Sequence, residues 1–192
     1  MKRFLILLAI LCVCCISINS VKAVSNAELQ DTSRFEHIIS KGDTGGGDGK
    51  YIELSTLKDV SASTSTKSIE AKIYVVLPSS DLIREYTIRY DYNLRYSFAN
   101  LVARMPEFKQ RVRDFNLGDI WNLKMDDSGI VGTVKAQQDY TLNGESKPIQ
   151  PGYKGYEHVT FLTPTDFDFE SYHVANQVFK KVFGIFYDDV IR

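Results

Sequence analysis

Cysteine is absent after residue 15. All three cysteines, Cys12, Cys14 and Cys15, lie in the apolar stretch LLAILCVCCI near the N-terminus. The rest of the chain therefore cannot form disulfides, thiolate metal sites or cysteine nucleophiles. A chain of 192 residues is long enough to bury a stabilising core without covalent cross-links.

The chain also lacks a large excess of positive or of negative charge. The chain has 23 Lys and Arg residues against 24 Asp and Glu residues, and its basic residues form no stripe, so nucleic-acid binding is not expected. No apolar run beyond the N-terminus approaches the roughly 20 residues that a membrane-spanning helix needs. Asn-x-Ser/Thr sequons are missing too, which favours a bacterial envelope protein over a eukaryotic secretory protein.

The N-terminus itself has the three parts of a secretory signal peptide. Two basic residues precede an apolar run at 4–16, and small residues then lead to Ala23. We expect cleavage after Ala23, with Ser20 as the alternative point, so that residues 1–23 are removed. Two other interpretations stay open. The segment remains as an uncleaved anchor, or it is a lipoprotein signal, although the residues before the three cysteines fit that signal poorly.

Residues 24–50 are predicted to form a flexible linker. The stretch KGDTGGGDGK at 41–50 is rich in glycine and aspartate and has no apolar residue. Such a composition has nothing to bury and stays solvated. We therefore expect a single folded domain at 51–192.

Alternation of apolar and polar residues with a period of two predicts the strands. It is clearest at 67–78 and 82–94, which are joined by the turn sequence PSSD and should pair as an antiparallel hairpin. Shorter strands are expected at 51–60 and 155–164. The stretch at 95–104 fits either a strand or a short helix.

Three further elements are expected before the C-terminus. Pro106 is suited to the first turn of a helix at 106–115. The segment at 120–136 predicts two strands around the turn Asp-Asp-Ser-Gly, with Trp121, Leu123 and Met125 on one face. A hairpin is also expected at Asn143-Gly144, a strong two-residue turn.

The C-terminal segment at 166–188 predicts an amphipathic helix. Its apolar residues recur at steps of three and four positions, and the sheet offers the surface for that face. Gly184 either permits close packing or ends the helix. The predicted fold class is α+β, an antiparallel meander sheet of about five or six strands with a C-terminal amphipathic helix packed on one face.

No motif marks a catalytic, cofactor-binding or metal-binding residue, and we name none. His37, His158 and His173 lack the spacing of metal ligands. The hydrolase motif Gly-x-Ser-x-Gly is missing, and the acidic residues offer no marked pair for acid/base catalysis.

An aromatic stretch, YTIRYDYNLRYSF at 86–98, is the most distinctive feature. Tyrosine and arginine are common in recognition surfaces, so Tyr86, Arg89, Tyr96 and Phe98 form a possible binding surface for a protein or a glycan. Packing between strands is the simpler interpretation, because tyrosine is also favoured in sheets. Tyr90 and Tyr92 are expected on the apolar side, under the helix.

The order of these segments resembles the surface-adhesin E family. The stretches that carry the resemblance are YIELSTLKDV, IEAKIYVV, YTIRYDYN and the closing NQVFKKVFGIFYD. The resemblance implies a six-stranded antiparallel sheet packed by a helix, in a family in which some members bind host matrix proteins. The adhesin uses cysteines and a lipid anchor, which the expected mature chain lacks, so no binding residue is carried over.

Together these features favour an exported bacterial envelope protein with a non-catalytic binding role, in the periplasm, at the cell surface or outside the cell. Contact with a membrane is expected only through the signal segment before cleavage. Two alternatives remain: an envelope enzyme with an unmarked acid/base pair, and an envelope assembly factor that acts through a free sheet edge.

Overall fold

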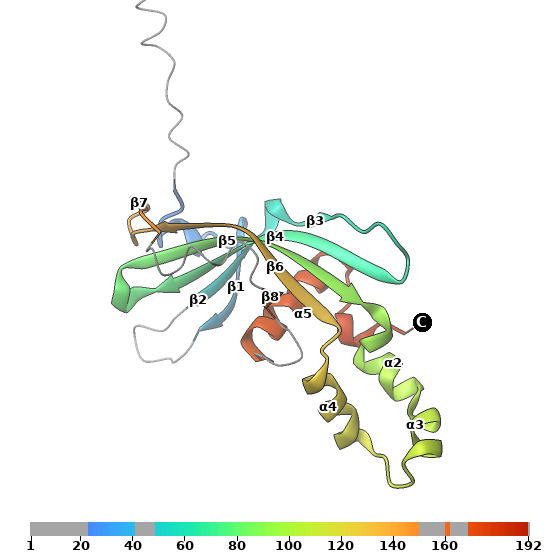
Figure 1. Ribbon diagram of the computed structural model, residues 1–192. Helices are drawn as coiled ribbons and strands as arrows, with labels where there is room; N and C mark the ends of the chain where they lie inside the picture. The colour runs from blue at the N-terminus through green and yellow to red at the C-terminus, as the bar shows by residue number, and fades with distance from the viewer. Residues whose placement is uncertain (1–22, 41–48, 150–159, 162–168, 192) are drawn as a thin grey trace, which may run out of the picture.

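The computed structural model describes residues 23–40, 49–149, 160–161 and 169–191 (Figure 1). Within these residues, eight antiparallel strands form one curled sheet in the order β1-β2-β4-β5-β6-β7, with β3 pairing with β4 and β8 pairing with β6. The strands are β1 Phe35–Ser40, β2 Gly49–Glu53, β3 Lys58–Asp59, β4 Thr66–Leu77, β5 Leu82–Asn93, β6 Ile130–Tyr140, β7 Ser146–Lys147 and β8 Thr160–Phe161. The helices are α2 Phe98–Ala103, α3 Met105–Arg111, α4 Leu117–Asp126 and α5 Phe169–Phe183.

The alternating pattern predicted the hairpin of β4 and β5, and this hairpin forms the centre of the sheet. Ile73 lies opposite Tyr86, and the pairing runs without a break from Thr66 to Leu77. Tyr90 and Tyr92 lie in the core on the side of α5, as expected, and the Tyr92 hydroxyl donates to the Ala175 carbonyl at 2.8 Å. The α+β fold class with a C-terminal helix on one face is therefore confirmed.

Helix α5 packs on one face of the sheet through the apolar stripe that its sequence indicated. Its buried residues are Tyr172, Val174, Ala175, Val178 and Phe179. The helix ends at Gly184, whose φ of +76° is a left-handed conformation that favours glycine. Of the two roles considered for Gly184, the structure therefore shows that this residue ends the helix.

The opposite face of the sheet has a core of its own, and it overturns the linker prediction for residues 24–40. Leu29 is buried beside Phe35, and strand β1 pairs with β2. The Asn26 amide also donates to the Leu142 carbonyl at 2.9 Å. The glycine-rich composition of 41–50 does not extend upstream, where apolar residues cover the second face. Residues 41–48 lie outside the described residues.

The segment at 120–126 is helical, so the predicted strand there is wrong. Asn116 and Asp119 form a capping box: the Asn116 Oδ1 atom accepts from the Gly118 amide at 2.7 Å, and the Asp119 carboxylate accepts from the Asn116 amide. Ile120 and Lys124, four residues apart, are both buried. The alternation of Trp121, Leu123 and Met125 resembled a strand, but the cap and the four-residue spacing determine the structure.

The other expectations had mixed outcomes. The ambiguous stretch after Leu94 becomes the short helices η4 Leu94–Tyr96 and α2, and α3 covers much of the helix expected at 106–115. The turn at Asn143-Gly144 does join β6 to β7. Of the strand expected at 155–164, only β8 lies within the described residues. Of the signal peptide predicted at 1–23, residues 1–22 lie outside them.

Gly129 allows a direct test of packing beside β6. A Cβ atom there would lie 2.3 Å from both the Tyr187 Oη atom and the Tyr96 Cβ atom, whereas one at Gly184 would meet nothing within 4 Å. Both residues have positive φ, so Gly184→Ala should cost only the backbone strain of about 1–2 kcal/mol. Gly129→Ala should cost roughly 1–3 kcal/mol more because the core is overpacked. Urea denaturation of the two variants measures the difference, and equal losses would contradict this packing.

Candidate functional site: a helical arm with a buried lysine anchor

Residues 98–126, here called the helical arm, are inserted between the neighbouring strands β5 and β6. Helices α2, α3 and α4 project from the sheet as a hairpin-like extension (Figure 1). Where the arm leaves the sheet, the Asn93 amide donates to the Gly129 carbonyl at 2.7 Å. The two ends of the insertion therefore stay together, and the strands continue to pair below it.

An apolar stripe runs along one side of α4. Leu117, Trp121 and Met125 follow at steps of four residues, which places them on one helix face. Their exposed fractions are 54%, 45% and 39%, although all three side chains are large and apolar. Trp121 also packs on Phe98 of α2, with 4.9 Å between the ring centroids. Contact with Phe98 of α2 thus holds Trp121 in place, while the outer side of the stripe is open to solvent.

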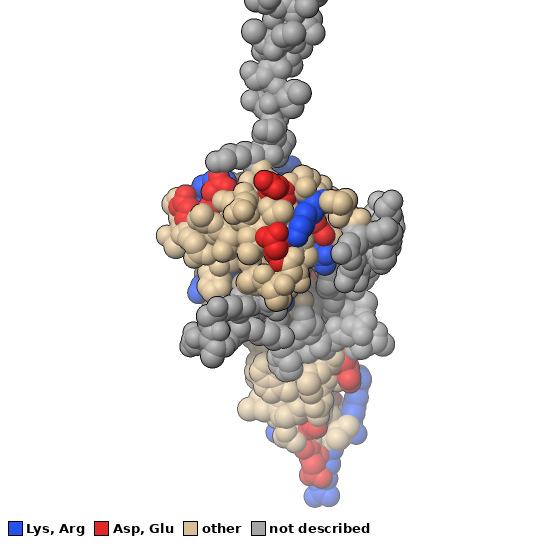
Figure 2. All heavy atoms as spheres, turned by 90° about the vertical axis from the view of Figure 1, so that its left-hand side faces the viewer, with Lys and Arg blue, Asp and Glu red and all other residues tan. Residues whose placement is uncertain are grey.

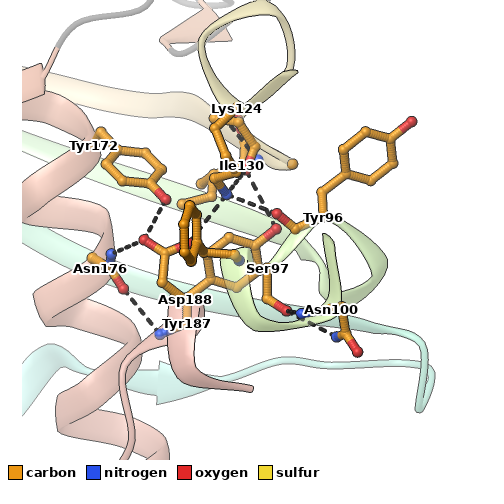
Figure 3. Close-up of polar contacts among 12 residues, drawn as sticks. Tyr96, Ser97, Asn100, Lys124, Ile130, Tyr172, Asn176, Tyr187 and Asp188 are labelled. Atoms are coloured by element: carbon orange, nitrogen blue, oxygen red, sulfur yellow. Dashed lines mark hydrogen bonds and ion pairs between the residues drawn. The ribbon is translucent and has the colours of Figure 1, made fainter. Parts of the chain in front are cut away.

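The base of the arm is fixed by the fully buried side chain of Lys124. Its Nζ atom donates to the carbonyls of Tyr96 and Ser128 at 2.8 and 2.7 Å (Figure 3). Asp188, in the C-terminal helix η7 Tyr187–Asp189, supplies the third partner, with Oδ1 at 3.2 Å. An ammonium group has three N–H donors, so this site satisfies all of them.

Asp188 collects further donors around its carboxylate. The Tyr172 hydroxyl and the Asn176 amide donate to Oδ2 at 2.5 and 2.9 Å, and the backbone amide of Phe98 donates to Oδ1 at 3.2 Å (Figure 3). A carboxylate that follows the last helix of a chain is ordinarily solvated. Asp188 instead joins α5, the start of α2 and the anchor lysine, and so it fixes the arm to the body.

The rings around this ion pair favour the buried, hydrogen-bonded arrangement. The Lys124 ammonium lies 4.7 Å from the ring centroid of Tyr187 and 5.2 Å from that of Tyr172. Burial lowers the pKa of Lys124 to about 8, although the charge and hydrogen bond of Asp188 act in the opposite direction. Burial also raises the pKa of Tyr172 and of Tyr187 well above the usual tyrosine range.

Two cavities lie along the side of the sheet that faces α5. One of about 220 Å³ is lined by Tyr86 and Tyr90 from β5 and by residues of α5. The other, of about 370 Å³, lies near the β4–β5 turn and contains Arg84 and Asp139. The Arg84 Nε and Nη2 atoms donate to the two carboxylate oxygens of Asp139 at 2.9 and 3.0 Å. This bidentate pair neutralises the one acidic side chain that lines the larger cavity.

The four residues predicted as a binding surface do not converge. Tyr86 faces the α5 side of the sheet, whereas Arg89 lies on the opposite face, where its Nε atom donates to the Asp91 carboxylate at 3.0 Å. Tyr96 lies at the base of the arm with its ring turned away from the Lys124 network (Figure 3). Phe98 begins the arm and supports Trp121. Tyr96 and Phe98 thus lie at the base of the arm, where they help to hold it, and they do not form its exposed surface.

The sequence interpretation missed Lys124, Asp188 and the stripe on α4. The spacing Asn-x-x-Asp at 116–119 was the available indication of a helix start. The histidines are separate: His37 stacks on Tyr51 with 4.8 Å between centroids, His173 is exposed on α5, and His158 lies outside the described residues. In the described part of the chain, no group of His, Cys, Asp and Glu side chains could hold a metal ion.

Comparison with known proteins returns no significant match to a protein family, to a curated protein or to a solved structure. The resemblance to the surface-adhesin E family therefore stays a prediction. Within the described segments, every helix is too short or too polar to cross a membrane.

The lysine anchor predicts an unusual pH dependence of stability. Between about pH 8 and 10.5, the unfolded chain keeps the Lys124 proton that the folded chain has lost, so the free energy of unfolding should rise with pH. Above about pH 10, the unfolded chain loses tyrosine protons that Tyr172 and Tyr187 retain when folded, so stability should fall. We expect a maximum near pH 9–10 that lies about 1–3 kcal/mol above the value at pH 7.

Urea denaturation as a function of pH measures this curve. Lys124→Met keeps a long side chain without the charge and should remove the rise while leaving the fall above pH 10. A free energy of unfolding that is constant or falling from pH 8 to 9.5 in the unmodified protein would show that burial does not lower the pKa of Lys124.

Proposed function

We propose that this chain is an exported bacterial envelope protein with a non-catalytic binding role, and that the helical arm makes the contact with its partner. The observation that carries this proposal is the exposed stripe of Leu117, Trp121 and Met125 on α4. Large apolar side chains grouped on one helix face are typical of interaction sites, and tryptophan is enriched at the centres of such sites.

The anchor supports the same proposal through the cost of binding. A partner that orders a mobile segment loses part of its affinity to that ordering. Lys124 and Asp188 hold both ends of the arm on the body before any partner arrives. The stripe is therefore presented by a preorganised element, which suits a binding role.

The two alternative functions have less support. An acid/base enzyme needs a carboxylate that can exchange a proton with its substrate, but Asp139 is 3% exposed and held by both arms of the Arg84 guanidinium. An assembly factor needs an open sheet edge. Strand β1 has a register shift between His37 and Ile39, and Glu36 pairs with Lys181 of α5, two features that discourage strand addition.

The export part of the proposal predicts a defined N-terminus. The intact mass of the protein from its native cells should match a chain that starts at Val24 and carries no lipid. Ala23→Phe removes the small side chain that cleavage requires, so this variant should keep the mass of the uncleaved chain or move to the Ser20 site. A full-length or lipid-bearing mass in the unmodified protein would overturn this part.

The binding part can be tested by site-specific photo-crosslinking in the same cells. A crosslinking amino acid in place of Leu117 should give discrete adducts, whereas the same group in place of Val131 should give few. Val131 is the matched control, because it is also apolar and 42% exposed but lies on strand β6. Equal adduct patterns from the two positions would show that the arm is not the contact element. The adducts are identified by mass, so the test holds for partners of any class.

A further inference from the structure

We propose that the partner of the arm is the surface of an anionic phospholipid bilayer, which the arm contacts with its basic tip and its apolar stripe. This inference rests on the proposed binding role and names the partner class. The sequence alone had suggested a protein or a glycan as the partner, so a lipid surface is a different class of partner.

The tip of the arm concentrates positive charge around an exposed apolar residue. Lys109, Arg111 and Arg113 flank Val112, which is 56% exposed. Among the described residues, none of these three basic side chains forms an ion pair. Figure 2 shows basic side chains at the lower end of the projection, with acidic ones just above them.

The tip itself carries more basic than acidic side chains, because its three basic residues face Asp114 alone and the next acidic residues, Glu107 and Asp119, have partners of their own in the arm. Glu107 pairs with Arg104 at 3.5 Å, and Asp119 accepts from the Asn116 amide at 2.8 Å in the helix cap. Asp114 is the acidic residue that remains next to the tip. The tip therefore keeps a local positive charge on a chain whose overall net charge is −1. This local charge is complementary to anionic headgroups.

The shape of the arm also favours a lipid surface. The stripe from Leu117 to Met125 spans about 12 Å along a convex helix. A protein partner would need a matching groove, whereas a bilayer interface accepts a convex apolar ridge without one. Trp121 suits this position because an indole ring has an apolar body and an N–H donor, a combination enriched at membrane interfaces.

Trp121 is the only tryptophan in the chain, so its fluorescence reports on the arm alone. The protein, purified in the processed form found in cells, is titrated with vesicles of phosphatidylglycerol and phosphatidylcholine, and with vesicles of phosphatidylcholine only. We expect a blue shift of the emission and co-sedimentation with the anionic vesicles, both lost at about 0.5 M salt because exposed charges are screened.

Two sets of variants separate charge from apolar contact. Replacement of Lys109, Arg111 and Arg113 together by Gln should weaken binding about a hundredfold, at about fivefold for each basic residue near the surface. The matched control replaces Lys58, Lys135 and Lys180, which are exposed away from the arm, and should bind nearly as the unmodified protein does. Val112→Ser and Leu117→Ser should also weaken binding, whereas Val131→Ser should not.

Three outcomes would overturn the lipid assignment: no blue shift or co-sedimentation, equal binding to neutral vesicles, or equal loss in the two triple variants. A blue shift that depends on protein concentration without vesicles would assign the stripe to a second copy of the chain instead. A protein adduct from position 117 without vesicle binding would overturn the lipid assignment and retain the proposed binding role. Failure of both experiments would overturn both.

Discussion

The ammonium group of Lys124 is the interaction on which the arrangement of this protein depends. It is withdrawn from water and satisfied by two backbone carbonyls and the Asp188 carboxylate, which come from three separate parts of the chain. A buried charge without such partners would cost several kcal/mol, roughly, so the strand ends, the arm and the C-terminal segment are constrained to meet there. The orientation of α4, and with it the exposed stripe, follows from that constraint.

Different segments of the chain cover the two faces of the sheet. Helix α5 covers one face with an apolar stripe, and residues 24–35 cover part of the other with Leu29 and Phe35. The arm lies beyond the end of the β5–β6 pairing and meets the α5 cover at Tyr172, Tyr187 and Asp188. Most of the body is therefore stabilised by its own two cores, while the arm carries exposed apolar and basic side chains.

The sequence predicted the elements whose pattern is local. Strands β4 and β5 alternate with a period of two over their full length, and the face of α5 repeats every three or four residues, so both could be recognised. Helix α4 was misassigned because Trp121, Leu123 and Met125 also alternate, and the cap at Asn116 is only a short signal. The linker prediction failed because the composition of 41–50 was extended to residues whose apolar side chains bury on the second face.

The candidate site was harder to predict for a physical reason. A lysine in a helix is ordinarily solvated, and nothing near Lys124 in the sequence indicates that Asp188, Tyr172 and Tyr187 will surround it. Its burial depends on residues that only the tertiary structure brings together. The aromatic stretch at 86–98 was distinctive mainly because tyrosine is a good strand residue: Tyr90 and Tyr92 are core residues, and the exposed Trp121 lies outside that stretch.

The hydrogen bond between Asn93 and Gly129 has a consequence for how such a chain can change. Since the two ends of the arm are already joined at the sheet, residues beyond the anchor can be gained, lost or exchanged without altering the register of β5 and β6. The sheet and its two cores then keep their structure while the outer part of the arm changes. A change in the length or chemistry of the outer arm is therefore expected to leave the sheet, Lys124 and Asp188 in place.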